Sequence, residues 1–112
     1  MTEIIFFLDN LDYDKLSSSE NITWEMVRNN LHRPWNFKTL SFNKVITWDN
    51  IQDTPFLKWD WSSVTLNVNI TLDIIKNNIQ CPWDFEILQD ILSNNDFESL
   101  TQCKNNNNNL DR

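Results

Sequence analysis

Few side chains of this 112-residue chain could do chemistry, and those that could are widely spaced. Glu25, Asp49 and Asp73 recur at intervals of 24 residues and resemble a carboxylate row for acid–base or metal chemistry. Each is expected in the first turn of a helix, where a negative charge complements the helix dipole by about 0.3–1 kcal/mol. Carboxylates that act on one sugar must face each other, whereas these would be spread along the molecule. We therefore predict a structural role for them.

The other nucleophiles and metal ligands also lack partners. His32 is the only histidine and is expected in a turn between two helices, exposed to solvent. Cys81 and Cys103 are 22 residues apart, without the close pairs that hold zinc or the basic neighbour that activates a thiolate. The absence of glycine removes the phosphate-binding loops and the nucleophile elbow. We predict no catalytic residue, no cofactor and no metal site, so the chain is not expected to be an enzyme.

Six tryptophans could form a stacking platform for nucleic-acid bases. A platform is disfavoured because sixteen acidic residues against nine basic ones give a net charge of −7, which repels phosphate. Repetition at fixed positions is instead what a packed core requires. We predict a core role for these side chains, which are Trp24, Trp35, Trp48, Trp59, Trp61 and Trp83.

One stretch of the chain is basic. Residues 22–45 carry a net charge of +3, while residues 1–21, 46–69, 70–93 and 94–112 are each net negative. The basic side chains could simply form a solvated face, or they could dock an acidic partner, including the acidic end of a second copy. Binding to a phosphate backbone is the third reading, and the surrounding acidic field opposes it. The candidate docking patch consists of Arg28, Arg33, Lys38 and Lys44.

The elements that would position these residues follow from an internal repeat of 24 residues. One block of the repeat occupies residues 22–27, 46–51 and 70–75, and a second begins at residues 35, 59 and 83. Each block has an apolar residue, a capping residue and an apolar residue four positions after the cap. This pattern is typical of a helix start closed by a hydrophobic staple. The predicted caps are Thr23, Asn36, Thr47, Asp60, Thr71 and Asp84.

The prolines before two of the tryptophans allow a second reading of the same pattern. Pro34 and Pro82 either hold the incoming chain extended or occupy the first position of the helix itself. The second reading moves the helix start by two residues and leaves the architecture unchanged.

The template extends to both ends, with blocks starting at residues 1, 11, 22, 35, 46, 59, 70, 83 and about 95. It predicts nine helices of roughly eight residues, too short to be stable alone in water. Asparagines are expected to end them in the left-handed conformation that glycine usually supplies, at Asn29–Asn30, Asn43, Asn67 and Asn77–Asn78.

The predicted fold is all-α, a short α-solenoid of stacked helical hairpins. A single domain would span residues 1–100, with units at 22–45, 46–69 and 70–93 and degenerate caps at 1–21 and 94–100. Residues 101–112, which include five consecutive asparagines, are expected to be a disordered tail.

The chain carries no sign of membrane insertion or secretion. Its longest apolar run, residues 4–8, is far shorter than the roughly 20 residues of a membrane span. Acidic residues flank the run, which is unlike a signal peptide. Two cysteines without a disulfide spacing fit a reducing compartment. We therefore expect a soluble, intracellular protein.

The repeated blocks resemble a known repeat type. Ile22-Thr23-Trp24-Glu25 and Pro34-Trp35-Asn36-Phe37 are similar to tandem tryptophan-containing repeats found in uncharacterised proteins of giant DNA viruses of the mimivirus-like group. The resemblance covers residues 9–92, and its departures are Lys58, Leu72 and Ile91. It implies a virus-encoded helical-repeat protein, acting in the host cytoplasm or packaged in the virion. It supplies no activity and no site residues.

The leading hypothesis is a non-catalytic protein–protein interaction or scaffold module. The alternative is a structural component of a viral particle or assembly. The expected partner is a protein, either host, viral or a second copy of this chain, with no nucleic acid, membrane or small molecule. Partner-binding groups are expected between cap and staple, where residues vary from unit to unit, as at Met26, Asn50 and Ile74 and at Lys38, Ser62 and Glu86.

Overall fold

The computed structural model describes the backbone of residues 11–110 and the side chains of residues 11–106. Within this part of the chain every regular element is a helix and none is a strand, which confirms the predicted all-α fold. The predicted helix at residue 1 lies outside the described residues. The helices are α2 (Tyr13–Ser17), α3 (Trp24–Arg28), α4 (Phe37–Phe42), α5 (Trp48–Asp53), α6 (Trp61–Thr65), α7 (Leu72–Asn77), α8 (Phe85–Ile91) and α9 (Asn94–Leu110).

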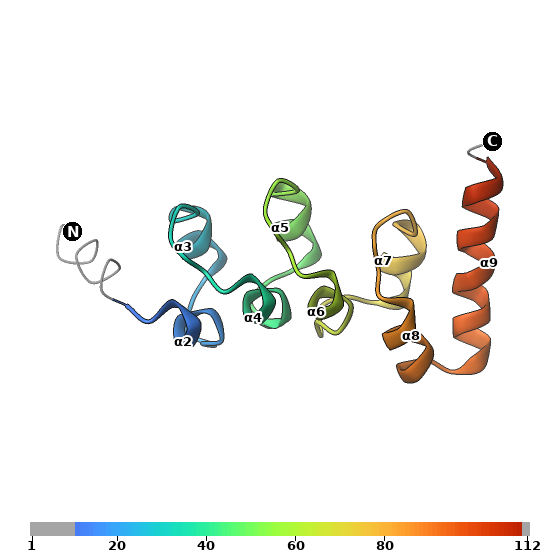
Figure 1. Ribbon diagram of the computed structural model, residues 1–112, viewed down its shortest axis with the longest axis horizontal. Coiled ribbons are helices and arrows are strands. Elements are labelled where there is room, and N and C mark those ends of the chain that lie inside the picture. Colours follow the sequence, from blue (N-terminus) through green and yellow to red (C-terminus); the bar gives the residue numbers. More distant parts are fainter. Residues whose placement is uncertain (1–10, 111–112) are drawn as a thin grey trace.

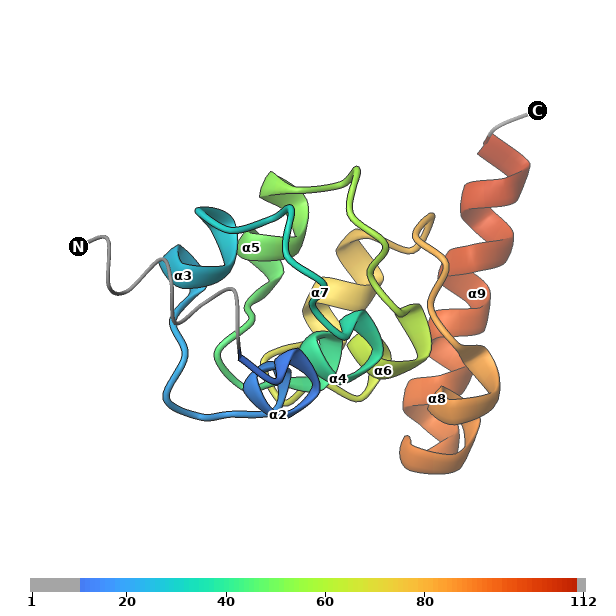
Figure 2. The same cartoon turned by 60° about the vertical axis from the view of Figure 1, so that its left-hand side comes forward.

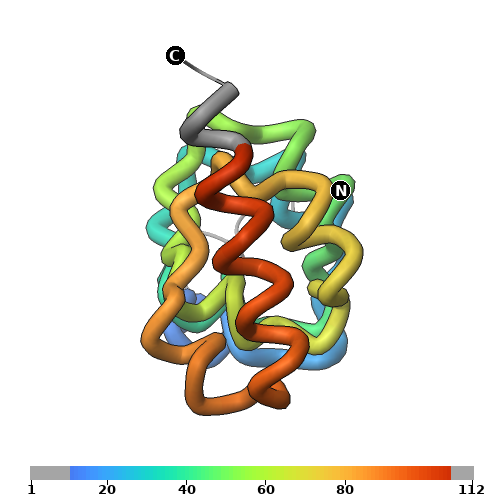
Figure 3. The backbone as a smooth tube through the Cα atoms, turned by 90° about the vertical axis from the view of Figure 1, so that its right-hand side faces the viewer, coloured from blue at the N-terminus to red at the C-terminus, as the bar shows by residue number. Residues whose placement is uncertain are grey.

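The helices are arranged in two rows along the long axis of a body that measures 53 × 28 × 17 Å. Helices α2, α4, α6 and α8 form one row, and α3, α5 and α7 form the other (Figures 1 and 2). Each unit of 24 residues contributes one helix to each row. Helix α9 stands upright across the end of the stack, as the end-on view in Figure 3 shows. This arrangement is compatible with the predicted solenoid of helical hairpins.

Side-chain caps begin these short helices, as predicted. The hydroxyl of Thr23 accepts a hydrogen bond from the Met26 N–H at 3.2 Å, and Thr47 and Thr71 repeat the contact one and two units later. Asn36, Asp60 and Asp84 cap the other row in the same way. Helices α4 and α8 begin three residues after Pro34 and Pro82, so the reading that places these prolines inside the helix is wrong.

The residues of the predicted staples form the centre of the core. Five of the six residues that precede the caps are buried, and the sixth, Ile70, is half-buried. All six residues four positions after the caps are buried: Val27, Leu40, Ile51, Val64, Ile75 and Leu88. The helices of the two rows are only five to seven residues long and are not stable alone, so this shared core holds the rows together.

Aromatic rings join successive units within the core. Tyr13 meets Trp35 with ring centres 5.0 Å apart, Phe37 meets Trp59 at 5.6 Å, and Trp61 meets Trp83 at 5.2 Å. All three pairs are nearly perpendicular, the edge-to-face geometry that aromatic pairs prefer. Trp35, Trp59 and Trp83 are buried, as predicted, whereas Trp24, Trp48 and Trp61 are only half-buried.

The predicted left-handed asparagines are not found. No residue has a positive φ in the described part of the chain, and Asn43 has a φ of −68°. The prediction for Asn29–Asn30, Asn43, Asn67 and Asn77–Asn78 is therefore wrong. The reason is that these helices end in tight turns with negative φ, in which the Asn43 N–H donates to the carbonyl of Leu40 at 3.0 Å.

The C-terminal predictions also need correction. Helix α9 begins at Asn94, beside the block start predicted at about residue 95, and the Ser93 hydroxyl accepts the Asp96 N–H at 3.2 Å. The helix then continues to Leu110, so the prediction of a disordered tail from residue 101 is wrong for residues 101–110. Packing explains the difference: Leu100 is fully buried and Cys103 contacts the core, which holds the helix beyond its last recognisable block. Residues 111–112 lie outside the described residues.

Candidate interaction surfaces

A row of buried hydroxyls fixes the spacing between the helices of the α2–α8 row. The Ser41 Oγ donates to the Phe37 carbonyl at 2.5 Å and accepts the Asp60 N–H of the next unit at 2.9 Å. Ser17 and Thr65 make the same two bonds. Each donates to the carbonyl four residues earlier, and they accept the N–H groups of Asn36 and Asp84 at 2.9 and 3.1 Å. We call these three hydroxyls the hydroxyl ladder. Each hydroxyl accepts a hydrogen bond from a backbone N–H at a helix start, which would otherwise need water as its partner.

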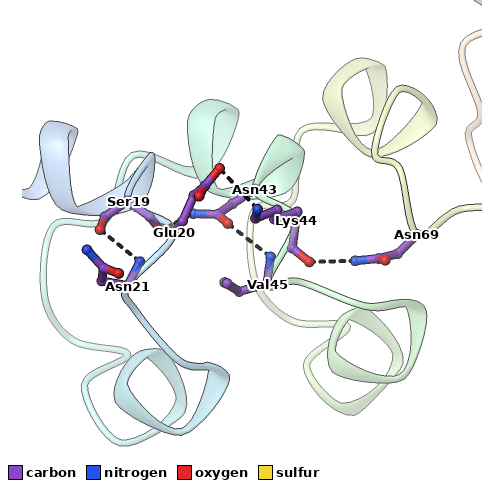
Figure 4. Close-up of polar contacts among 7 residues, drawn as sticks. All are labelled: Ser19, Glu20, Asn21, Asn43, Lys44, Val45 and Asn69. Atoms are coloured by element: carbon purple, nitrogen blue, oxygen red, sulfur yellow. Dashed lines mark hydrogen bonds and ion pairs between the residues drawn. The ribbon is translucent and has the colours of Figure 1, made fainter.

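Buried amides tie the loops of the same row together. The Asn43 Nδ2 donates to the carbonyls of Ser17 and Ser19, at 2.8 and 2.9 Å, and its Oδ1 accepts the Val45 N–H at 3.0 Å. Asn67, one unit later, repeats this pattern. Figure 4 marks the bond between Asn43 and Val45 and, beside it, the bond from the Asn69 side chain to the Lys44 carbonyl. The sequence carries a signal for both sets, since the hydroxyls and the amides each recur at a spacing of 24, but it does not reveal their partners.

The buried tryptophans are held by their indole N–H groups. The Trp83 Nε1 donates to the Asn78 carbonyl at 2.8 Å, and the Asn78 side chain donates to the carbonyl of Ile74 in α7. Trp35 and Trp59 make the equivalent bonds to the carbonyls of residues 30 and 54. Each of these bonds spans five residues and closes the connection between the two helices of one unit.

The first concave surface lies among the loops that follow α2, α4 and α6, and we call it the loop groove. Its volume is about 270 Å³. Three exposed apolar side chains dominate it: Phe42 is 57% exposed, Leu66 43% and Val68 76%. Phe42 and Leu66 are equivalent residues of successive units. The full lining is Ser18, Glu20, Thr39, Phe42, Asn43, Lys44, Leu66 and Val68.

An exposed ion pair borders the loop groove. The Lys44 Nζ lies 3.1 Å from a carboxylate oxygen of Glu20, and both side chains are largely in solvent (Figure 4). The Lys44 carbonyl accepts a hydrogen bond from the Asn69 side chain, which anchors the backbone of the loop. The groove therefore offers an apolar floor with one charge of each sign at its edge.

The second concave surface lies between the unit at 46–69 and the unit at 70–93, and we call it the tryptophan pocket. Its volume is about 280 Å³. The rings of Trp48 and Trp61 stand 6.2 Å apart at an angle of 70°. Burial raises the pKa of the Cys81 thiol in the lining, so the thiolate is disfavoured. The lining is Trp48, Ile51, Gln52, Pro55, Leu57, Trp59, Trp61, Asn78, Gln80 and Cys81.

The residues of the predicted basic patch lie on separate segments. Arg28 is in the last turn of α3, in the upper row of Figure 1, and Lys38 is in the first turn of α4, in the lower row. Arg33 lies in the connection between them, with its Nε buried. Lys44 borders the loop groove. Of the four, Lys44 alone lines a concave surface among those described above.

The variable positions between cap and staple differ in exposure. Met26, Asn50 and Ile74 are half-buried, and the Asn50 side chain completes a capping box with Thr47. Lys38, Ser62 and Glu86 are exposed. The Ser62 hydroxyl donates to the Asp84 carboxylate at 2.7 Å, and this bond lowers the pKa of Asp84. The exposed set therefore remains available to a partner, while the half-buried set serves the fold.

The residues considered for chemistry remain apart. Glu25, Asp49 and Asp73 lie exposed in the first turns of three successive helices, and His32 is exposed between α3 and α4. Among the described residues no three of the His, Cys, Asp and Glu side chains gather into a group that could hold a metal ion. None of the helices in this part of the chain combines the length and apolar character that a membrane crossing requires. Comparison with protein-family models, curated proteins and solved structures finds no match to this chain.

Proposed function

We propose that this chain is a non-catalytic helical-repeat protein that binds another protein, as an interaction or scaffold module. The observation that carries the proposal is the loop groove. Three of the six exposed large apolar side chains of the described residues, Phe42, Leu66 and Val68, gather there. Contiguous exposed apolar surface is typical of protein-binding sites, whereas scattered apolar residues are not.

The groove also indicates what kind of partner fits it. An apolar side chain can pack between Phe42 and Leu66, and the Glu20–Lys44 pair at the edge provides a polar rim that orients the partner. Lys44 belongs to the predicted basic patch, so an acidic group beside the apolar one would complement it. The resemblance to giant-virus repeats supports a viral origin and a partner in the host cytoplasm.

Affinity capture with matched variants tests the proposal. The wild-type chain, the double variant Phe42→Ser/Leu66→Ser and the control Phe56→Ser are each expressed in host cells and captured. Phe56 is 71% exposed but does not line the groove, so it controls for a general loss of apolar surface. We expect one protein to be enriched by the wild type and the control and lost by the double variant. Far-UV circular dichroism should show that all three are folded.

Two outcomes would contradict the proposal. The first is equal recovery of the same proteins by all three chains, which would show that binding does not depend on the groove. The second is abundance of the chain in purified viral particles with no soluble partner, which would favour the alternative of a structural component. A captured partner is then purified, and its affinity for the three chains is compared by calorimetry.

A further inference from the structure

The tryptophan pocket lies at one of three junctions along the stack. It lies at the middle junction, between residues 46–69 and residues 70–93. The N-terminal junction joins residues 22–45 to residues 46–69, and the C-terminal junction joins residues 70–93 to α9. Equivalent residues of the three units differ by 24 in number, so the side chains that each unit contributes to its junction can be compared.

At the C-terminal junction a cation lies against an aromatic ring. The Nζ of Lys104, on α9, lies 4.3 Å from the centre of the Phe85 ring. Phe85 is the equivalent of Trp61, which lines the tryptophan pocket, whereas α9 is one continuous helix and does not follow the 24-residue pattern. A lysine ammonium within about 6 Å of an aromatic face is attracted by the ring. The protein thus places its own basic side chain against the equivalent aromatic ring.

At the N-terminal junction a second basic side chain is folded inward. Arg33 is the equivalent of Leu57, which lines the pocket. The Nε atom of Arg33 is buried, so this side chain lies against the protein along much of its length. The N-terminal junction therefore has a cationic side chain at a position of the pocket lining, and the C-terminal junction has one against Phe85.

The middle junction has neither cation but has the better aromatic walls. Leu57 stands where the N-terminal junction has Arg33, and a cavity of about 280 Å³ remains beside Trp61. Trp48 and Trp61 form walls of this cavity and are only half-buried. Tryptophan attracts cations more strongly than the other aromatic side chains do. Both units at this junction are acidic, at −2 for residues 46–69 and −3 for residues 70–93.

We propose that the tryptophan pocket binds a lysine or arginine side chain of a partner protein, against the rings of Trp48 and Trp61, as Lys104 lies against Phe85. The negative charge of the two units attracts such a group. The side-chain carbonyl oxygens of Gln52 and Gln80 can accept its N–H groups. This inference rests on the proposed protein-binding function, but the site shares no lining residue with the loop groove, so the peptide test below can fail while binding at the groove holds.

Three short peptides provide the test. Acetylated and amidated Ala-X-Ala peptides, in which X is lysine, arginine or the uncharged norleucine, are titrated into the full chain. Binding is followed through the indole N–H signals of Trp48 and Trp61 in ¹H–¹⁵N spectra. We expect saturable shifts with the lysine and arginine peptides and at least about tenfold weaker binding of the norleucine peptide. Equal binding of all three, or no shift with any of them at about 10 mM, would overturn the proposal.

A variant that fills the pocket from within makes the test specific. Leu57→Arg introduces the residue that occupies the equivalent position at the N-terminal junction. We expect it to weaken binding of the lysine peptide by about tenfold, while the matched control Leu57→Met binds as the wild type does. Unchanged binding by a folded Leu57→Arg chain would place the peptide elsewhere and overturn the proposal. If that variant does not fold, Gln80→Lys, which places an ammonium group in the pocket lining, supports or overturns the proposal by the same measurement.

Discussion

Asn67 is the residue whose removal should most clearly weaken the stack. Its side chain is 2% exposed and joins two units through the carbonyls of Ser41 and Asn43, at 2.9 and 3.1 Å. Its Oδ1 also accepts the Asn69 N–H at 2.8 Å. Its Nδ2 donates to a third carbonyl as well, that of Ile46, at 3.3 Å. The Asn43 and Ile46 carbonyls accept other donors too, so replacing Asn67 with alanine chiefly deprives the Ser41 carbonyl and the Asn69 N–H of their partner.

The expected cost follows from these lost bonds. A buried donor or acceptor without its partner costs about 1–3 kcal/mol, and water that enters the space left by the side chain offsets part of this cost. For the Ser41 carbonyl and the Asn69 N–H together we expect Asn67→Ala to lower the free energy of unfolding by about 3 kcal/mol. In a chain of this size such a loss lowers the melting temperature by about 10 °C or more. Urea unfolding followed by circular dichroism at 222 nm measures the change.

A matched asparagine gives the control. Asn77 is exposed at the end of α7, so Asn77→Ala should change the stability by less than about 0.5 kcal/mol. The reasoning would be refuted if Asn67→Ala and Asn77→Ala unfolded at the same urea concentration. A further variant, Asn67→Asp, places carboxylate oxygens against the same carbonyls. Burial against these carbonyls disfavours the charged form and raises the folded-state pKa of the new carboxyl. The loss of stability relative to the wild type should therefore become smaller at low pH, where the protonated carboxyl is again a donor.

Three further predictions concern single groups. Ser62→Ala removes the hydrogen bond that lowers the pKa of Asp84, so the pKa should rise toward its ordinary value in a carboxyl ¹³C titration. Because the folded-state pKa is depressed, the stabilisation is present at neutral pH and is lost as the pH falls through that pKa; an unchanged titration would contradict the assignment. Thr71→Ala removes the cap on the Ile74 N–H and should cost about 1 kcal/mol, whereas Thr71→Ser should cost little; equal losses in thermal melts would argue against the cap. Burial raises the pKa of Cys81, so iodoacetamide should alkylate it more slowly in the folded chain than in urea, and equal rates by mass spectrometry would show that the thiol is open to solvent.

The local structure of the helices was predictable because it depends on neighbouring residues. Each cap contacts an N–H three residues away, and each staple joins residues five apart, so both appear directly in the sequence. Recurrence at a spacing of 24 then distinguished these patterns from chance. The prediction from neighbouring residues was wrong for the asparagines at helix ends, which do not adopt the left-handed backbone conformation. Whether an asparagine adopts a left-handed backbone or donates from its side chain depends on which carbonyls lie nearby.

The contacts between units were beyond the reach of sequence reasoning. The Asn43 side chain bonds carbonyls 24 and 26 residues away, and the Ser41 hydroxyl bonds an N–H 19 residues away. These pairings exist only after the rows have formed. Helix α9 was cut short in prediction for a related reason. A run of asparagines has no amphipathic pattern, while the packing that extends the helix comes from α7 and α8.

The candidate surfaces were predictable in part. Lys44 was expected in a docking patch, and it borders the loop groove. Phe42 and Leu66 were not singled out, because an apolar residue near a helix end is usually buried, and their exposure follows from the direction in which each loop turns. The open pocket beside Trp61 was missed because the tryptophans were assigned to the core as one group.

Hydrogen exchange of three backbone amides tests the central claim, that a hydroxyl ladder joins successive units. The N–H groups of Asn36, Asp60 and Asp84 belong to N-cap residues, which lie outside the hydrogen-bonding of their own helices. Here each donates to a hydroxyl of the preceding unit. We predict that all three exchange slowly, with protection close to that of the core. Exchange of all three at the rate of an unstructured peptide would contradict the ladder and, with it, the stacked arrangement.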